Sequence, residues 1–313
     1  MFSLFFWQGI DTITNILTEA GFILLFVCPF AVPDQYLGSE AWRILFPPNF
    51  RPHRLKALLA SWIGSSVNTL MPVATIGGEI VKARIIVLLL YSSTKAAATI
   101  TVDKTVQAIA VLIWGLIGAI LLLIYIGPSA IVTGIFISSG ILAIGIFGFI
   151  IVQIKGGFTK IAQKLTVFTG QAENHRLKKS TLEFQHSIEE IYKNKNRIVL
   201  ATILRLLQRI ILVGEIVLAS HIFGTPIGIM EAMILKGIIG AIRGLSFAIP
   251  AGLGIQEGGY VAIGALIGHP PDLMIAISLT TRLREILPNI PLLFLWQILE
   301  GRSYNRYTND KKN

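Results

Sequence analysis

The stretch TVQAIAVLIWGLIGAILLLIYIGPSAIVTGIFISSGILAIGIFGFIIVQI, residues 105–154, decides the class of fold. It contains no Asp, Glu, Lys or Arg, and it is interrupted once, by Gly127 and Pro128. A bilayer core of roughly 30 Å needs about 20 apolar residues of α-helix, so this stretch is long enough for two crossings joined by a tight turn. We therefore predict an antiparallel pair of membrane-spanning helices.

The composition of the whole chain agrees with that prediction. Of its 313 residues, 53% are hydrophobic and 14% are charged, whereas about a quarter of the residues in an ordinary soluble domain are charged. The mean hydropathy is +0.70. We predict an all-α, polytopic membrane helix bundle that forms a single integral membrane domain over residues 1–313. Its predicted full spans are at about 12–33, 98–126, 129–153, 198–223, 226–249 and 272–299.

Two further apolar regions are too short to cross a bilayer as straight helices. Residues 57–71 and 76–91 meet at Pro72, and residues 252–268 follow Pro250. At 1.5 Å per residue, each segment spans roughly 22–25 Å, and the Pro and Gly residues around it interrupt helical hydrogen bonding. We predict broken or re-entrant helices, because irregular backbone at membrane depth must line a cavity or be buried in protein.

The distribution of Lys and Arg predicts the orientation of the chain. These residues are concentrated in 34–56, 154–197 and 300–313, whereas the tight turns between the predicted spans contain none. By the positive-inside rule, the three basic segments lie in the cytoplasm and the N-terminus lies outside. The net charge of +10 has the same explanation, so we expect no nucleic acid partner.

The basic loop 154–197 contains apolar residues at helical spacing. Leu177, Phe184, Ile188 and Ile191 are separated by Lys and Glu, and residues 158–168 show a similar pattern. This pattern predicts two amphipathic helices that lie on the cytoplasmic leaflet or dock under the bundle. A solvated helical hairpin without a functional role is the simpler alternative.

Cysteine and histidine usage argues against metal and redox chemistry. Cys28 is the only cysteine, and the five histidines are too scattered for an HExxH-type pair. The chain also has no GxxxxGK[ST] motif for ATP. We expect no cofactor and no metal site, and any transport would be passive, ion-coupled or driven by a partner.

Charged residues occur inside the apolar segments, where each costs about 2.5–3.5 kcal/mol on the insertion scale. Acids and bases nearly balance, so salt bridges that only fix helix packing are one explanation. A hydrated groove for a polar group is the other, and we favour it because packing alone rarely needs so many charges. The candidate residues for this groove are Asn68, Pro72, Gly77, Gly78, Glu79, Arg84, Asp103, Lys104, Arg243, Pro250, Gly252, Gly254, Gln256, Glu257, Arg282, Arg284 and Glu285.

A proline, a glutamate and a base recur at a fixed offset of 178 residues. Because the first copy runs outward and the second inward in the predicted topology, we predict an inverted repeat, which in many transporters places a site near the bilayer midplane. A half-helix N-terminus at each break presents free N–H groups that suit an anion such as phosphate, or the glutamate of the repeat itself. The matched residues are Pro72 and Pro250, Glu79 and Glu257, and Lys104 and Arg282.

Three blocks carry a resemblance to a known family. They are WIGSSVNTLMPVATIGGEIVKAR (residues 62–84), RGLSFAIPAGLGIQEGG (243–259) and RLRE (282–285). The chain resembles the flippase-like membrane family, which includes the lysylphosphatidylglycerol synthase transmembrane region. Within that family it is most similar to the hopanoid-biosynthesis-associated branch, and the similarity extends from Tyr36 to Glu300.

The resemblance implies a multi-pass protein of the bacterial cytoplasmic (inner) membrane that takes part in lipid transport. Its partners would be membrane lipids, either a hopanoid or an anionic phospholipid, and proteins of lipid biosynthesis or envelope transport. Only a short basic tail follows Glu300, so we expect no aminoacyl transfer and no enzymatic activity from this chain.

Two alternatives stay open. The first is a scaffold that does not transport lipid but recruits biosynthetic enzymes through residues 154–197. The second is a membrane-embedded lipid-modifying enzyme in which Glu79, Asp103 and Glu257 chelate Mg²⁺, although no DDxxD-like run supports it.

Overall fold

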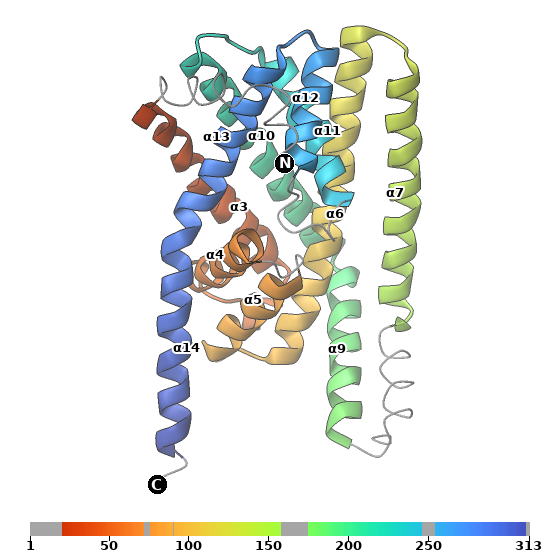
Figure 1. Ribbon diagram of the computed structural model, residues 1–313. Coiled ribbons are helices and arrows are strands. Elements are labelled where there is room, and N and C mark those ends of the chain that lie inside the picture. The colour runs from red at the N-terminus through yellow and green to blue at the C-terminus, as the bar shows by residue number, and fades with distance from the viewer. Residues whose placement is uncertain (1–20, 72–75, 90, 158–174, 246–253, 311–313) are drawn as a thin grey trace.

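The computed structural model describes residues 21–71, 76–89, 91–157, 175–245 and 254–310, and all regular structure among them is helical (Figure 1). The predicted all-α class is therefore confirmed. In chain order the elements are η1 (Gly21–Phe30), α3 (Ala31–Ile44), η2 (Pro48–Phe50), α4 (Arg54–Leu70), α5 (Gly77–Leu88), α6 (Ser93–Ile126), α7 (Ala130–Ile154), α9 (His175–Lys193), α10 (Lys195–Ile222), α11 (Ile229–Leu245), α12 (Ile255–Leu266), α13 (Pro271–Ile286), η5 (Leu287–Asn289) and α14 (Ile290–Asp310).

The predicted pair of spans over residues 105–154 is present as α6 and α7. Gly127 ends α6 with φ +77°, a conformation that glycine adopts without a steric penalty, and the chain turns back at once. α7 lies at the edge of the bundle (Figure 1), and its only buried residues are Val132, Ile146 and Gln153. An apolar helix that exposes most of its surface is what a bilayer, rather than water, would solvate.

Three helical segments are long and apolar enough to cross a membrane by themselves, among the residues that the structure describes. They are Gly21–Ile44, Ser93–Ile126 and Ala130–Ile154. These segments support a multi-pass membrane location. Residues 12–20 of the first predicted span lie outside the described residues.

The predicted end of the first span, near residue 33, differs from the structure. Helical backbone continues through α3 to Ile44, although this segment contains the acids Asp34 and Glu40. Both acids are buried and satisfied: Asp34 accepts a hydrogen bond from Gln208 at 2.8 Å, and Glu40 pairs with Arg43 at 2.8 Å. Because Arg284, 3.5 Å from Asp34, and Arg43 compensate the two charges, the helix does not have to stop at the acids.

The last predicted span, 272–299, is not one continuous helix. It consists of α13, the short 3-10 helix η5 and the first part of α14. Pro288 lies within η5 and has no N–H for the helical ladder, which explains the interruption. α14 then continues as helix to Asp310, through most of the basic tail predicted at 300–313.

The first pair of short segments forms two helices, α4 and α5, that pack tightly against each other. Gly64 and Gly78 meet where they cross, and a side chain at Gly78 would clash with the carbonyl oxygen of Gly64. Asn68 stabilises the start of α5, because its Oδ1 accepts the N–H of Gly78 at 2.8 Å. Pro72 lies outside the described residues.

The second short segment is α12, and its bounds match those of α5. α12 begins and ends 178 residues after α5 begins and ends, and α13 begins 178 residues after α6 begins. In Figure 1, α6 starts in the lower half of the bundle and runs upward, whereas α13 starts at the upper end and runs downward. Pro250 and Gly252 lie outside the described residues.

The amphipathic pattern in the basic loop corresponds to α9. Ile188 and Ile191 are fully buried and pack with residues of α6 that include Val102. The second half of the loop is therefore docked under the bundle and is not a solvated hairpin. The other predicted amphipathic helix, over 158–168, lies outside the described residues.

Candidate functional site

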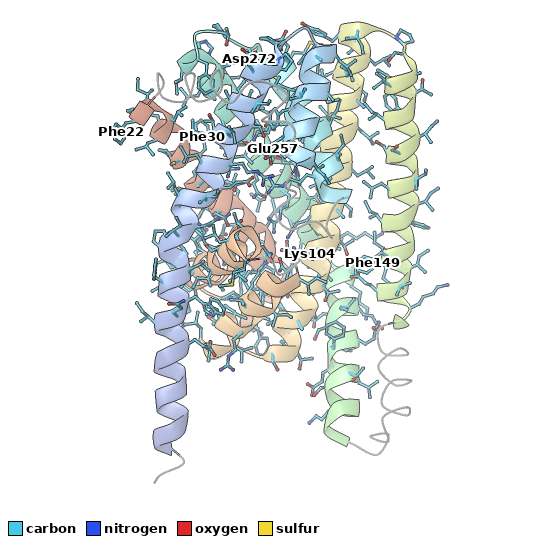
Figure 2. The ribbon with its side chains drawn as sticks, viewed as in Figure 1. Phe22, Phe30, Lys104, Phe149, Glu257 and Asp272 are labelled. Carbon is cyan, nitrogen blue, oxygen red and sulfur yellow. The ribbon has the colours of Figure 1, made fainter. Side chains whose placement is uncertain are left out.

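Two clusters of charged side chains lie inside the helix bundle. Figure 2 places Glu257 in its upper half and Lys104 in its lower half. The lower cluster contains Glu79, Lys82, Asp103, Lys104 and Arg205. The upper cluster contains Asp34, Glu215, Lys236, Arg243, Glu257, Arg282, Arg284 and Glu285.

Asp103 is the centre of the lower cluster. Both of its carboxylate oxygens accept hydrogen bonds from Arg205, at 2.7 and 2.8 Å, and Lys82 and Gln107 donate to it at 3.1 and 2.9 Å. The ammonium group of Lys82 also lies 4.1 Å from the centre of the Trp42 ring, a favourable cation–π geometry. Asp103 is fully buried, and two cations compensate its charge.

Glu79 lies at the more open side of the lower cluster. Its Oε1 is 2.5 Å from the ammonium group of Lys104, and its Oε2 is 3.8 Å from that of Lys82. Oε2 is buried but accepts no hydrogen bond. Glu79 therefore has an incompletely satisfied carboxylate next to a partly exposed cation.

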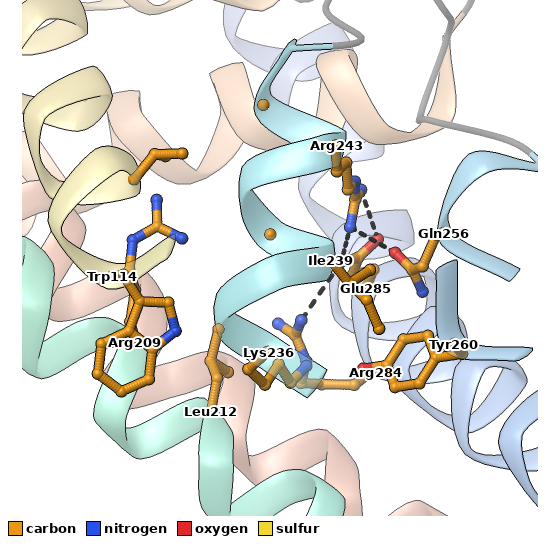
Figure 3. Close-up of a pocket in the computed structure, with 13 residues that line it drawn as sticks. Trp114, Arg209, Leu212, Lys236, Ile239, Arg243, Gln256, Tyr260, Arg284 and Glu285 are labelled. Atoms are coloured by element: carbon orange, nitrogen blue, oxygen red, sulfur yellow. Dashed lines mark hydrogen bonds and ion pairs between the residues drawn. The ribbon is translucent and has the colours of Figure 1, made fainter. Parts of the chain in front are cut away.

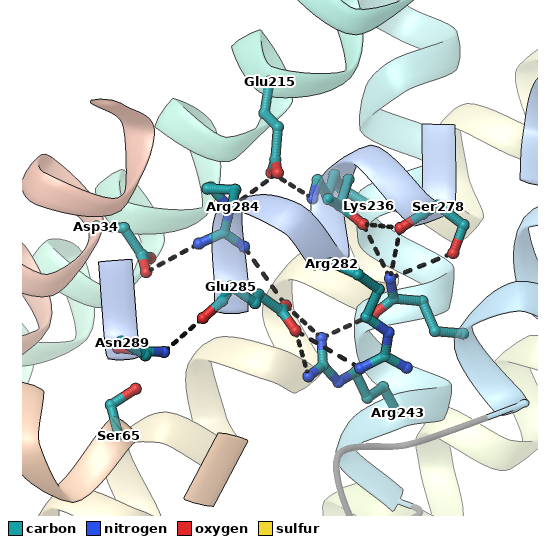
Figure 4. Close-up of polar contacts among 12 residues, drawn as sticks. Asp34, Ser65, Glu215, Lys236, Arg243, Ser278, Arg282, Arg284, Glu285 and Asn289 are labelled. Atoms are coloured by element: carbon teal, nitrogen blue, oxygen red, sulfur yellow. Dashed lines mark hydrogen bonds and ion pairs between the residues drawn. The ribbon is translucent and has the colours of Figure 1, made fainter. Parts of the chain in front are cut away.

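Arg284 connects three acids of the upper cluster (Figure 4). Its guanidinium lies 2.8 Å from Glu215, 3.5 Å from Asp34 and 3.4 Å from Glu285. Lys236 approaches the other oxygen of Glu215 at 2.8 Å. Arg284 thus links α13 to α3 and α10, and Glu215 extends this link to Lys236 of α11.

Arg243 and Glu285 form the other half of the upper cluster. The two side chains make a two-pronged contact, with distances of 2.6 and 2.9 Å, a geometry that adds strength and fixes orientation. Arg243 also donates to Gln256 at 2.8 Å, and Gln256 donates to Thr281 at 2.9 Å. Arg282 approaches Glu285 at 3.6 Å.

Glu257 has a structural role in addition to its charge. Its Oε2 accepts the N–H of Gly254 at 2.8 Å, which caps the start of α12, and its Oε1 accepts from Arg282 at 3.1 Å. Gly254 has φ +82°, which explains a glycine at that position. Both oxygens of Glu257 are therefore engaged within the protein.

Two cavities adjoin the upper cluster. The first, of about 260 Å³, is bordered by α6, α10, α11, α12 and α13 (Figure 3). The second, of about 200 Å³, is bordered by α3, α4 and η5 as well as α10, α11 and α13. Leu212, Arg243, Arg284 and Glu285 line both cavities. The Arg243–Glu285 pair thus forms part of the partition between the two cavities.

The structure brings most of the candidate residues into one of the two clusters. Arg243, Gln256, Glu257, Arg282, Arg284 and Glu285 meet in the upper cluster, and Glu79, Asp103 and Lys104 meet in the lower one. Asn68, Gly77, Gly78 and Gly254 act at helix starts or crossings, as described above. Arg84 lies apart, exposed, and pairs with Glu300 at 3.1 Å.

Six charged residues of the clusters and the first cavity are absent from the predicted groove: Asp34, Lys82, Arg205, Arg209, Glu215 and Lys236. The two arginines lie four residues apart in the predicted span 198–223, and that spacing places them on one helix face. This spacing was a usable signal. Asp34 gave none, because it lies just beyond the predicted end of the first span. Among the described residues, no group of three or more His, Cys, Asp or Glu side chains is arranged to hold a metal ion.

The comparisons with known proteins identify one family. The family model described as "Lysylphosphatidylglycerol synthase TM region" matches residues 1–292, most of the chain. Neither the curated proteins nor the solved structures gave a match.

Proposed function

Because the chain belongs to the lysylphosphatidylglycerol synthase TM region family, we propose that it is a flippase-like membrane protein that moves a lipid between the leaflets of a bilayer. The family connects the chain with lipid biosynthesis or lipid flipping in a membrane. We further propose that it works in the bacterial inner membrane and acts as a transporter rather than an enzyme. A hopanoid or an anionic phospholipid is its proposed cargo, in keeping with its resemblance to the hopanoid-associated branch.

The observation that carries this proposal is the pair of cavities that share Arg243, Arg284 and Glu285. A polar headgroup crossing a bilayer needs polar partners at membrane depth, because desolvation is costly there. Two cavities on either side of an ion pair that can open supply such partners one after the other. The acyl tails would stay in the bilayer while the headgroup passes.

We propose that the Arg243–Glu285 pair is the gate of this path. An anionic headgroup that pairs with Arg243 replaces Glu285 as its partner, and the released Glu285 still has Arg284 and Arg282 as cationic neighbours at 3.4 and 3.6 Å. Arg284 remains balanced by Glu215 and Asp34. The gate therefore exchanges one ion pair for another.

We also propose that two inverted repeats build the path, within a bundle of six full spans. The equal spacing of α5 and α12, and of the starts of α6 and α13, supports this. The matched residues pair in the same way in both copies: Glu79 with Lys104, and Glu257 with Arg282. Transporters built from inverted repeats commonly bind substrate where the two copies meet.

The proposed orientation has the C-terminus in the cytoplasm and the N-terminus outside. The connections between α6 and α7 and between α12 and α13, which lack Lys and Arg, lie at the upper end of the bundle in Figure 1, whereas α9 and the end of α14 lie at the lower end. This orientation is tested with single cysteines placed near the N-terminus and near the C-terminus and labelled with a reagent that cannot cross the membrane. Labelling of both termini from the same side would contradict it.

A leaflet-resolved lipid assay in reconstituted vesicles tests the proposed function. We expect the wild-type chain to redistribute a labelled hopanoid or anionic phospholipid. We expect Glu285→Gln to slow this about tenfold or more, because no carboxylate then displaces the headgroup from Arg243 and the lipid stays bound. Glu183→Gln, an exposed change on α9, serves as the charge-matched control. If folded wild-type protein leaves every tested lipid in place, the proposal is wrong.

The scaffold alternative requires a different experiment from deleting the basic loop. Ile188 and Ile191 of α9 are core residues, so deletion of α9 would damage the bundle as well as any docking surface. Charge reversal of the exposed Glu183 and Glu190 leaves the core intact. A scaffold would lose its partners after this change, whereas we expect a transporter to keep its rate.

A further inference from the structure

Arg209 differs from every other arginine or lysine around the first cavity. It lies on α10 and lines the first cavity, and no dashed contact reaches it in the close-up (Figure 3). Within the described part of the chain it has no ion pair and no hydrogen bond, and its Nε is buried without a partner. The side chain as a whole is partly buried, and a cation without a partner is costly where water is scarce.

Every acid near Arg209 already pairs with another base. In the upper cluster, four bases pair with four acids. Asp103 of the lower cluster, which pairs with Arg205 at 2.7 Å, also pairs with Lys82. Arg209 therefore gives the first cavity one positive charge that forms no ion pair with any described side chain.

The rest of the cavity provides space and an apolar surface beside this charge. Gly240 and Gly244 contribute no side chain, and Val111 and Ile239 contribute apolar ones. A β-carbon at Gly240 would lie 3.7 Å from a terminal nitrogen of Arg209, so a larger residue there would crowd the guanidinium. The volume of about 260 Å³ corresponds to several water molecules at about 30 Å³ each, enough for a phosphate group and a few attached atoms.

Residues next to Arg209 on α10 suit lipid tails. Leu207 and Ile210 are exposed and apolar, as is Ile203 one turn earlier. A helix turns by about 100° per residue, so this apolar strip faces roughly 100–160° away from Arg209 around α10. The competition between a lipid and inorganic phosphate, described below, therefore decides between a lipid headgroup and a free anion.

We propose that Arg209 binds the phosphate group of a lipid with a singly anionic headgroup, in the first cavity. This inference rests on the proposed function and deepens it, because it assigns the substrate class. A zwitterionic headgroup would bring a second cation close to Lys236, Arg243 and Arg284, so the site favours an anionic lipid over a zwitterionic one. A neutral hopanoid offers no partner for the uncompensated charge.

Equilibrium binding to the purified full-length chain in a non-ionic detergent tests the site. The probes are short-chain phosphatidylglycerol, short-chain phosphatidylcholine and inorganic phosphate. We expect phosphatidylglycerol to bind wild type. Arg209→Gln should weaken its binding about tenfold or more, because the charged hydrogen-bond donor is lost, whereas Arg209→Lys should retain part of the binding, because a charged donor remains. Lys195→Gln on the same helix should bind as wild type.

Thermal unfolding of the same variants without added lipid supplies a readout that a structural role would not give. Removing a partly buried charge that has no ion-pair partner should leave the midpoint unchanged or raise it, whereas removing a structural ion-pair partner lowers it. Added phosphatidylglycerol should raise the midpoint of wild type but not that of Arg209→Gln. A lower midpoint for Arg209→Gln without lipid would contradict the site.

The remaining outcomes separate this inference from the proposed function. If Arg209→Gln binds phosphatidylglycerol as tightly as wild type, the site is wrong, even if lipid still moves between leaflets. If phosphate alone displaces the lipid at equal concentration, the site serves a free anion and the lipid assignment is wrong. If binding depends on Arg209 but no lipid changes leaflet, the site stands and the transport proposal fails.

Discussion

The two matched ion pairs, Glu79–Lys104 and Glu257–Arg282, have the same chemistry but different surroundings. The Glu257 and Arg282 side chains are 3% and 8% exposed, and the second oxygen of Glu257 caps a helix. The Glu79 and Lys104 side chains are 17% and 37% exposed, and the second oxygen of Glu79 accepts no hydrogen bond. One pair is closed and fully satisfied, and the other is open.

This difference indicates different roles for residues that the sequence pattern treats as equivalent. A buried, satisfied pair changes protonation or partner only at a large cost in free energy, whereas a half-exposed pair exchanges its partners for water or a ligand more easily. Glu257 is therefore expected to hold α12 and α13 together. Glu79 is the better candidate for a group that changes during transport.

The largest effect is expected at Asp103, the buried centre next to the open pair. Asp103→Ala leaves Arg205 without a carboxylate and Lys82 with only that of Glu79, 3.8 Å away, so we expect a loss of about 5 kcal/mol of stability, or failure to fold. Thermal unfolding and size-exclusion profiles in detergent measure this. A well-folded Asp103→Ala with an unchanged midpoint would show that hydration already compensates both cations.

Glu257→Ala tests whether the closed pair is structural. It leaves Arg282 with Glu285 as its remaining acid at 3.6 Å and removes the cap of Gly254. We expect a loss of about 3 kcal/mol, seen as a lower unfolding midpoint in detergent. Glu257→Gln should retain part of that stability, since its amide oxygen still accepts a hydrogen bond. Equal unfolding midpoints for Glu257→Ala and wild type would contradict a structural role for Glu257.

Glu79→Gln tests whether the open pair, Glu79–Lys104, has a role in transport. Because the pair is partly exposed, we expect a loss of stability of about 1 kcal/mol or less, together with a clear loss of lipid redistribution in vesicles. If Glu79 carries a proton during transport, wild type also depends on a proton gradient and Glu79→Gln does not. Transport that ignores both the gradient and the substitution would remove this coupling scheme.

Arg84→Gln should have the smallest effect. Its pair with Glu300 is exposed, with side-chain exposures of 51% and 40%, and exposed pairs contribute about 0–1 kcal/mol. We expect an unfolding midpoint close to that of wild type. A large decrease would mean that the end of α14 is held chiefly by this contact.

Local patterns predicted most of the helices. The uncharged run over residues 105–154 gave α6 and α7, and the short segments gave α4, α5 and α12 within a few residues. The predictions were wrong where contacts between helices compensate a residue that is unfavourable by its local sequence alone. Asp34 is buried in a helix because Gln208 and Arg284 reach it, and Pro288 interrupts the span predicted over 272–299.

The sequence by itself determined that this chain is an all-helical membrane bundle with charged residues at depth and a repeated glutamate and base. Hydropathy, helix breakers and a fixed offset are properties of the chain alone. Only the tertiary structure decided which charges compensate one another. Asp103 and Arg205 meet across 102 residues, and Arg209, one turn further along the same helix, is left without an acid. The energy of a buried charge depends on distances between helices, and no local pattern contains those distances.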